Sequence, residues 1–430
     1  MEPNGVDQPG TPRLLRAIND RTALRLLADR GPLSRSQLGA LAGLSKPTAS
    51  QLVDRLEAAG LVEPVVEIAP EPEVSIVAER APGRTARRYR LRGAAAHVAG
   101  LDVTPGRILT RICDLSGRIV GTGALPTPGR SAAGAVDRVR AALAAACEPA
   151  GISAAALHHV VIGLGGAIDP ATGRLGFARH LPGWHEPDLL ARLRTTLTPD
   201  GAADPRVDIE NDVNLAAVAE QAVGAAADAR DFVVLWIADG IGAAVVIDGR
   251  LHRGATGGAG EVGYMPVPGA PLVRTIGRGT TGGFQALAGA PAVLKLARRH
   301  GFSGADASAA LARAAGALRS GQPAAREAAR TLLADLADRL ATGLAPLVAV
   351  LDPELIVLTG AVPRAGGAVL REMTAEALHG MAIPRPRLVE SAVPDNPVLA
   401  GAIHAALAAT RETVFSATVP ATASAASSTA

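Results

Sequence analysis

The 430-residue chain contains only two cysteines, Cys113 and Cys147, and only two lysines, Lys46 and Lys295. Two cysteines exclude a disulfide framework and suit a reducing compartment. No apolar run reaches the length that spans a bilayer, and the polar first residues lack the apolar core of a signal peptide. We therefore expect a cytoplasmic protein with no membrane partner.

The chain also has little net charge. Its formal charge is +3, which by itself is too small to indicate nucleic-acid binding. Residues 1–92 hold 14 basic and 11 acidic side chains, so the whole excess lies in that segment. A hydrophobic content of 48% with 19% charged residues is typical of a globular protein, and the length allows roughly two to four domains.

The N-terminal segment has the pattern of three helices. Helical periodicity over 14–29 ends at Gly31 and Pro32, and Ser34 with Gln37 forms a capping box that starts a second helix. Ser45 is the expected N-cap of a third helix. Its apolar residues are spaced i, i+3, i+4 and i+7 and form one stripe: Ala49, Leu52, Val53 and Leu56.

The other face of the third helix is polar, as a DNA recognition helix requires. We predict DNA contacts from four of its residues: Lys46, Thr48, Gln51 and Arg55. Arginines that include Arg84 and Arg87 then flank strand-like residues, which is typical of a wing whose tip enters a minor groove. Residues 56–79 carry six Glu and no Lys or Arg, so that stretch has to project away from DNA. A small three-helix module that binds protein is the alternative.

Glycine is concentrated over residues 238–264. Apolar runs at 231–238 and 243–247 flank Asp239-Gly-Ile-Gly242, which predicts a hairpin whose turn contains Gly240 and Gly242. Glycine turns let backbone N–H groups approach an anion. A second glycine-rich run then carries one carboxylate, Glu261. We interpret the region as a phosphate or sugar site; the alternative is a long surface loop with a salt-bridged Glu.

A cluster of polar residues lies upstream, in Glu210-Asn-Asp-Val-Asn214, between a short apolar entry and an Ala-rich helix. An N-cap accounts for one of these side chains but does not readily account for all of them. A carboxylate here, Asp212, could accept the proton of a sugar hydroxyl while the neighbouring Asn211 fixes the sugar by hydrogen bonds.

These motifs, with Asp352-Pro-Glu-Leu-Ile-Val-Leu-Thr-Gly360, resemble the ROK family (repressor, open reading frame, kinase). With the helix-turn-helix in front, the chain resembles the sugar-responsive repressors of that family over about residues 13–412. The resemblance implies an α/β, two-lobed, actin-like ATPase fold after a winged helix-turn-helix domain. It also implies that Asp212 is the catalytic base and that Glu261 binds sugar. The turn over 163–169, with Gly166, and the loop that ends at Trp184 resemble sugar-side loops of the family.

The chain departs from the family pattern both in the phosphate loop and on the sugar side. The first phosphate loop keeps Asp102, but Thr104-Pro105-Gly106 replaces Gly-Gly-Thr, and Pro105 has no N–H for a phosphate. We expect only remnants of phosphate binding: Asp102, Gly240, Gly242 and Gly360. On the sugar side Tyr264 replaces a His, Gln285 replaces a Glu, and residues 266–285 contain no Cys or His. We therefore expect no structural zinc, whereas Gln285 can still hydrogen-bond a sugar.

These observations predict a sugar-responsive DNA-binding regulator with four segments: a disordered stretch 1–12, a winged helix-turn-helix over 13–92, a sugar-binding module over 93–412 and a disordered tail over 413–430. Its expected partners are operator DNA, a sugar or sugar phosphate and a second copy of the chain, and no cofactor is expected. The alternative is a bifunctional regulator that still phosphorylates its sugar with ATP and Mg. A protein-interaction scaffold is a third class.

Overall fold

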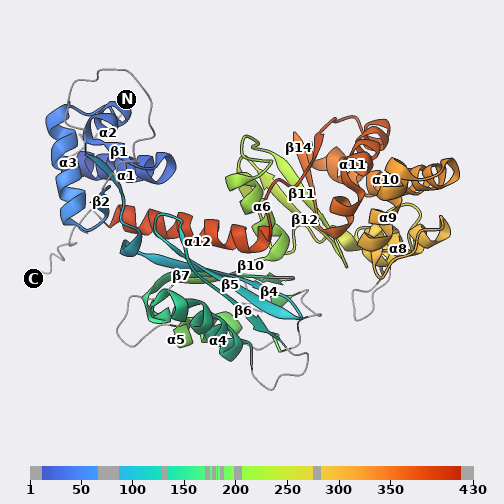
Figure 1. The fold of residues 1–430 in the computed structure, drawn as a ribbon, viewed down its shortest axis with the longest axis horizontal. Helices are drawn as coiled ribbons and strands as arrows, with labels where there is room; N and C mark the ends of the chain where they lie inside the picture. Colours follow the sequence, from blue (N-terminus) through green and yellow to red (C-terminus); the bar gives the residue numbers. More distant parts are fainter. Residues whose placement is uncertain are drawn as a thin grey trace, which may run out of the picture.

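The computed structural model describes residues 12–65, 87–127, 134–169, 175–176, 181, 183–184, 188–197, 206–274 and 282–417. Three bodies follow one another along the chain: a small helical domain, a first lobe and a second lobe (Figure 1). A single C-terminal helix runs back from the second lobe across the first lobe to the small domain. Within the described ranges, no helix is both long enough and apolar enough to cross a membrane.

The small domain is a three-helix unit with a three-stranded sheet in the order β1-β3-β2. Its elements are α1 (Pro12–Arg30), β1 (Leu33–Ser34), α2 (Arg35–Ala42), α3 (Lys46–Ala58), β2 (Val62–Pro64) and β3 (Arg88–Leu91). The Ser34–Gln37 capping box and the Ser45 N-cap are both present. The apolar stripe of α3 is buried as predicted. The predicted start of the chain before Pro12 and the wing tip with Arg84 lie outside the described residues.

The first lobe is built on a five-stranded sheet in the order β10-β7-β4-β5-β6. Its strands are β4 (His97–Val103), β5 (Arg107–Asp114), β6 (Ile119–Pro126), β7 (Leu157–Leu164) and β10 (Arg206–Asn211). Helices α4 (Ala135–Cys147) and α5 (Leu189–Leu197) cover one face, with the short strands β8 (Ala167–Ile168) and β9 (Leu175–Gly176) beside the sheet. The lobe also contains the 3-10 helices η1 (Gly93–Ala95), η2 (Glu148–Ala150) and η3 (Ala154–Ala156).

The second lobe repeats this sheet topology. Its order is β13-β12-β11-β14-β15, in which three antiparallel strands are followed by two parallel strands, as in the first lobe. The strands are β11 (Phe232–Ile237), β12 (Ile241–Ile247), β13 (Arg250–His252), β14 (Leu355–Thr359) and β15 (Arg387–Glu390). Helices α7 (Gly283–Ala288), α8 (Ala290–Arg299), α9 (Ala307–Ser320), α10 (Pro323–Leu351) and α11 (Ala361–Met381) pack together, and η4 (Val262–Tyr264) precedes α7. The repeated α/β lobes are those of the actin-like ATPase fold.

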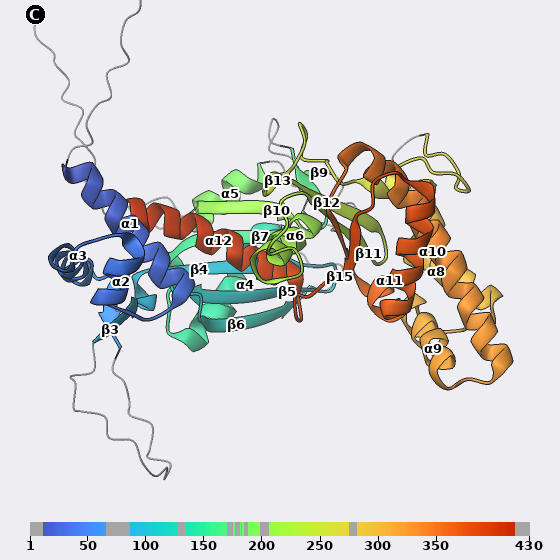
Figure 2. The same cartoon turned by 90° about the horizontal axis from the view of Figure 1, so that it is seen from above.

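Two helices lie between the sheets. Helix α6 (Asp212–Val223) contributes to clusters on both lobes, and α12 (Pro397–Ser416) covers the free face of the first sheet (Figure 2). The two helices pack closely because α12 has a glycine at the crossing point: a Cβ at Gly401 would overlap the carbonyl oxygen of Leu215 in α6. The crossing therefore fixes α12 against the helix that begins at Asp212.

The end of α12 corrects one predicted boundary. We expected a disordered tail from residue 413, but the helix continues to Ser416. Phe415 is 2% exposed and belongs to the hydrophobic core of the small domain, together with Leu115 from the turn after β5. Burial of these apolar side chains stabilises the last helical turn. The core of the small domain is thus completed by residues beyond 13–92.

Candidate functional site

Asn211 joins β10 to α6 and is the N-cap of that helix. Its Oδ1 accepts hydrogen bonds from the backbone N–H groups of Val213 (2.9 Å) and Asn214 (3.1 Å). Its Nδ2 donates to the carbonyl of Gly166 at 3.1 Å. The structure therefore brings the predicted residues Asn211 and Gly166 together, and it gives the Asn211 amide a structural role in addition to any contact with ligand.

Three carboxylates influence one another at the start of α6. Burial, and then the negative charge of Asp102, raises the pKa of Asp212 from 3.8 to about 6, although a hydrogen bond from the Val213 N–H opposes the shift. Burial, and then the charge of Asp212, raises the pKa of Glu261 to about 7. Such carboxylates gain from ligand hydroxyls that donate hydrogen bonds, and perturbed pKa values of this kind cluster at functional sites. Among the described side chains, no group of three His, Cys, Asp or Glu is arranged to hold a metal ion.

Asp102 is held from the far end of the chain. The amide of Asn396, the N-cap of α12, donates to Asp102 Oδ2 at 2.6 Å. Burial nevertheless raises the pKa of Asp102, and this hydrogen bond and Arg107 oppose the shift. The sequence did not single out Asn396; only its position before Pro397, typical of a helix start, was visible there.

The turn between β4 and β5 is closed on itself. The Thr104 N–H donates to the Arg107 carbonyl at 2.9 Å, and the Arg107 N–H donates back to Thr104 Oγ1 at 3.3 Å. Thr127 binds the carbonyls of Pro105 and Gly106, each at 2.9 Å. Because Pro105 has no N–H, at most the N–H of Gly106 is left for an incoming phosphate.

Glu261 is fixed against β12 by its glycine neighbours. Gly260 has φ +94°, and a Cβ there would overlap the Ala243 carbonyl, so the position requires glycine. The Ala243 N–H donates to the Gly260 carbonyl at 2.8 Å. Glu261 is the N-cap residue of η4, which contains Tyr264. The glycine-rich run therefore attaches Glu261 to the second-lobe sheet. It is not the long surface loop that was the alternative interpretation.

Gln285 and the predicted glycines lie on the same lobe. A Cβ at Gly263 would lie 3.4 Å from Gln285 Oε1, so Gln285 in α7 approaches the segment that carries Glu261 and Tyr264. A Cβ at Gly242 would lie 3.0 Å from Val213, directly after Asp212. Gly360 abuts Ile237, the last residue of β11. The hairpin and Gly360 therefore share the sheet edge that faces the start of α6.

A cavity of about 400 Å³ extends from this region and is lined by Asp239, Gln285 and Lys295. Lys295 projects from α8 and is the only lysine outside the small domain. No sequence motif had pointed to Lys295. The Lys295 ammonium group therefore lies in the same cavity as Asp239 of the hairpin turn.

Trp184 ends a loop that resembles a sugar-side loop of the family, but its side chain is buried. It is 1% exposed and belongs to the hydrophobic cluster of the first lobe. The guanidinium of Arg138 lies over the indole ring at 5.9 Å from the ring centroid. Trp184 is therefore a packing residue.

The predicted recognition helix has the expected exposed face. Lys46, Thr48 and Gln51 are exposed on α3. Thr48 Oγ1 lies 2.8 Å from the capping hydroxyl of Ser45, which orients the Thr48 side chain. Lys46, Thr48 and Gln51 thus remain available to a duplex.

The arginines of the small domain are more constrained. Arg55 Nε donates to the buried carboxylate of Asp20 at 3.0 Å, and a second Arg55 nitrogen pairs with the same group. Arg55, expected on the DNA side, therefore anchors α3 to α1. Arg87 lies 3.8 Å from Glu57 and over the ring of Tyr89.

Arg35 was not predicted to have a role. It donates hydrogen bonds to Ser50 (2.8 Å) and to the Tyr89 hydroxyl (2.9 Å), and so it holds α2, α3 and β3 together.

Comparison with known proteins gives the family. Residues 98–410 match the ROK family profile, and residues 18–68 match the MarR family profile. The chain belongs to the ROK family, with an N-terminal MarR-type winged helix domain. Its fold resembles a crystal structure of a ROK family transcriptional regulator, described as a homolog of the E. coli MLC protein, with a TM-score of 0.66 at 20% identity over 94% of this chain and 99% of that one.

Two curated relatives differ in activity. The bifunctional enzyme NanE/NanK of Brucella suis is 38% identical over 185 residues, which is 43% of this chain and 31% of that enzyme. The DNA-binding transcriptional dual regulator NagC of Escherichia coli is 24% identical over 273 residues, 62% of each chain. The chain thus spans about a third of the first relative and less than two thirds of the second.

Proposed function

We propose that this protein is a sugar-responsive, DNA-binding transcriptional regulator in which the ROK module senses the effector. The observation that carries the proposal is α12, which supplies Phe415 to the core of the small domain and Asn396 to the carboxylate of Asp102. One helix therefore touches both the DNA-binding core and the candidate sugar site. A sugar that prefers one lobe arrangement shifts the population of DNA-competent molecules by its differential affinity.

The DNA partner is supported by the exposed polar face of α3, with Lys46, Thr48 and Gln51, and by the relative NagC, whose name describes a DNA-binding regulator. Winged helix proteins commonly bind as symmetric pairs. We propose that two copies of the chain bind a near-palindromic operator as a repressor.

The effector is a sugar or sugar phosphate that binds at Asp212 and Glu261. Sugar hydroxyls donate to these carboxylates, and Asn211, Tyr264 and Gln285 complete the site with polar groups. Because the buried carboxylates repel anions, the phosphate of a sugar phosphate has to lie away from them, on the Lys295 side.

No nucleotide or zinc enters this mechanism. Phosphoryl transfer depends on donors that hold the phosphates, and the β4–β5 turn uses its own carbonyls and hydroxyls to satisfy those donors. We propose that the chain has lost kinase activity and that Asp212 acts in sugar binding.

Asp212 itself favours a second candidate, a bifunctional regulator with slow, ATP- and Mg-dependent sugar kinase activity. A pKa of about 6 suits a general base near neutral pH. Identity to NanE/NanK over 185 residues supports the same alternative.

Two measurements on the full-length chain test these candidates. Fluorescence anisotropy with the chain's own upstream DNA, against a scrambled duplex of equal length, should show specific binding that changes with one member of a sugar and sugar-phosphate panel. A coupled assay with that sugar and Mg-ATP should show no ADP formation above background. Equal affinity for both duplexes would reject the regulator, and turnover that disappears in Asp212→Asn would favour the kinase.

A further inference from the structure

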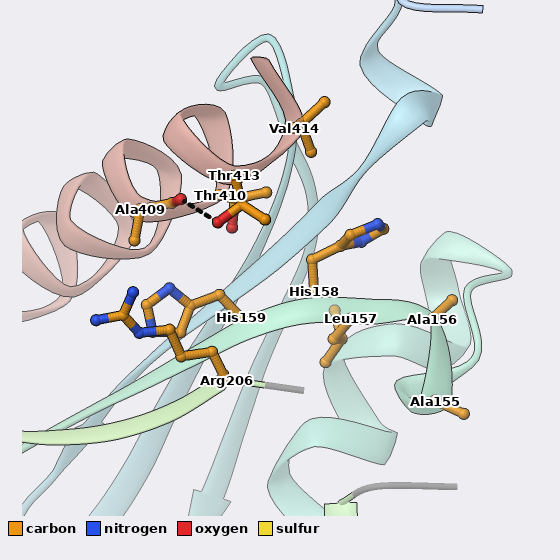
Figure 3. A pocket seen from close by; sticks show the side chains of 10 residues that line it. All are labelled: Ala155, Ala156, Leu157, His158, His159, Arg206, Ala409, Thr410, Thr413 and Val414. Atoms are coloured by element: carbon orange, nitrogen blue, oxygen red, sulfur yellow. Dashed lines mark hydrogen bonds between the residues drawn. The ribbon is translucent and has the colours of Figure 1, made fainter. Parts of the chain in front are cut away.

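The junction between the first lobe and its neighbours contains unfilled space. A cavity of about 450 Å³ lies between β7 and α12, with Thr410 and Thr413 of α12 on one side and His158 and His159 of β7 on the other (Figure 3). A second cavity of about 420 Å³ shares His159 with it and runs along β10, beside α6 and α12. Among the described residues that line the second cavity, only Arg253 belongs to the second lobe. The contacts of Arg253 therefore bear on how the two lobes are joined.

Arg253 forms an ion pair with Glu210 across the lobes. Arg253 directly follows β13, the edge strand of the second-lobe sheet, and Glu210 lies in β10 of the first-lobe sheet. Arg253 Nε donates to Glu210 Oε2 at 2.6 Å, and the Glu210 side chain is only 16% exposed. A charge-assisted hydrogen bond is stronger than a neutral one, and a partly buried pair is screened less by salt. The pair therefore links one lobe to the other.

The second oxygen of Glu210 holds the start of α6. Glu210 Oε1 accepts hydrogen bonds from the Asn211 N–H at 3.0 Å and from Asn214 Nδ2 at 2.9 Å. Asn211 is the N-cap of α6, and Asp212 is the first residue of that helix. Because both carboxylate oxygens have donors, the Glu210 side chain is held in one orientation. Arg253 is thus connected, through one intervening side chain, to the segment that carries Asp212.

The backbone of Arg253 is connected to the segment that carries Glu261. The Ala259 N–H donates to the Arg253 carbonyl at 3.2 Å. Gly254 has φ +72°, a conformation that favours glycine, and a Cβ there would lie 3.1 Å from the Ala259 Cβ. The chain therefore turns back at Gly254 and closes a short loop, and Gly260 and Glu261 follow directly after Ala259. A displacement of Arg253 is passed to Glu261 over this closed loop.

We propose that Arg253 is a positioning residue for the candidate sugar site, and that through Glu210 it sets the separation between Asp212 and Glu261. Arg253 itself does not contact the ligand. A sugar whose hydroxyls donate to both carboxylates binds best when their separation is fixed in advance, because less ordering is then needed on binding. The role in ligand binding rests on the proposed function, whereas the positioning of the two carboxylates does not.

The first test measures the positioning in the full-length chain without a ligand. Burial, and then the charge of Asp212, raises the pKa of Glu261 to about 7, and both influences weaken when the two carboxylates separate. Arg253→Met should therefore move the titration midpoint of Glu261 to lower pH by about 0.5 or more. Carbon-13 NMR of the glutamate carboxyl groups measures this midpoint, with Glu261→Gln to assign the resonance. Arg253→Lys keeps the positive charge and should retain the wild-type midpoint.

The control and the opposite outcome are equally defined. Arg250→Met removes an exposed arginine of β13, three residues before Arg253, and should leave the Glu261 titration unchanged. Loss of a nearby positive charge without any movement would raise the pKa of Glu261, because a cation stabilises the ionised carboxylate. A midpoint in Arg253→Met that rises, or that equals the wild-type value, would overturn the proposal.

The second test measures ligand binding by isothermal titration calorimetry, with D-glucose and N-acetyl-D-glucosamine as probes. Arg253→Met should weaken a probe that binds wild type at least 5-fold, whereas Arg253→Lys should stay within 2-fold and Arg250→Met should not change it. Equal affinity of wild type and Arg253→Met for such a probe would overturn the proposal. Failure of both probes to bind wild type would count against the proposed function alone, because the NMR titration decides the positioning without a sugar.

Discussion

Glu412 near the end of α12 accepts a hydrogen bond of 2.9 Å from Arg25 on α1, and Arg21 pairs with the same carboxylate. The pairing lies on the surface, where ion pairs contribute little to stability. Its importance is geometric, because it fixes the register of two helices whose apolar contact is made by the buried Phe415. The small domain and α12 are therefore joined by an ion pair and by a shared apolar core.

Phe415→Ala should destabilise the small domain by about 3–5 kcal/mol, because the truncation leaves a cavity in its core. Urea denaturation followed by circular dichroism should show an early transition that wild type lacks. Val350→Ala, at an 82% exposed position on α10, is the control and should unfold like wild type. A Phe415→Ala chain with unchanged unfolding would mean that α12 does not support the small domain.

The two lysines form a matched pair for DNA binding. Lys46→Ala should weaken operator binding uniformly across sequences and reduce the slope of log K against log salt by about 1, because one phosphate contact is lost. Lys295→Ala, on α8 of the second lobe, should change neither quantity. The measurement is anisotropy at a series of salt concentrations. Equal salt slopes for Lys46→Ala and wild type would remove Lys46 from the DNA surface.

The buried carboxylates predict a pH dependence of stability. Folding raises the pKa of Asp212 to about 6 and of Glu261 to about 7, so the folded state binds protons more readily than the unfolded state. The resulting destabilisation is absent below about pH 4, grows as the pH rises and is complete above about pH 7.

Asp212→Asn should therefore stabilise the sugar-free protein more at pH 8 than at pH 5. The free energy of unfolding should differ between the two pH values by about 1–3 kcal/mol, and the melting temperature should rise more at pH 8. Differential scanning fluorimetry at both pH values measures the difference. Asp137→Asn, on the exposed face of α4, is the control. An equal loss of stability at both pH values would show that the Asp212 carboxylate is favourably hydrogen-bonded in the free protein.

Glu261→Gln should remove the sugar-dependent change in operator affinity and leave sugar-free DNA binding nearly intact, because Glu261 and α3 lie in separate bodies. Loss of a charged hydrogen bond should weaken the sugar by about 1.5–3 kcal/mol. Calorimetry and anisotropy check the two effects, with Glu372→Gln on the surface of α11 as the control. A full sugar response in Glu261→Gln would place the effector site elsewhere.

Local signals in the sequence predicted much of the fold. The Ser34–Gln37 capping box, the stripe of α3 and the hairpin after β11 each depend on residues close together in the chain, and the structure contains all three. The predicted turn was too long, because Gly242 lies in β12 opposite Trp236. The order of motifs then indicated the lobes. Local preference and tertiary structure agree at these positions.

Long-range pairings could not be predicted in the same way. Arg55 looked available for phosphate because nothing in the sequence shows that Asp20, 35 residues earlier, lies beneath it. Asn396 pairs with Asp102 across 294 positions, and Phe415 lies in the segment 413–430 that was predicted to be a disordered tail. Each depends on a contact between separate elements, which periodicity and capping do not encode.

The glycine crossing of α6 and α12 has a mechanical consequence. Gly401 lies 14 residues before Phe415 on α12, so the two are separated by about 21 Å along the helix axis. Beyond Gly401, α12 packs on the first-lobe sheet, so the helix and that sheet tilt together against α6. A tilt of about 5° about Gly401 displaces Phe415, and the small domain with it, by about 2 Å. A small rotation of the first lobe against α6 therefore produces a larger displacement of α3 in the small domain.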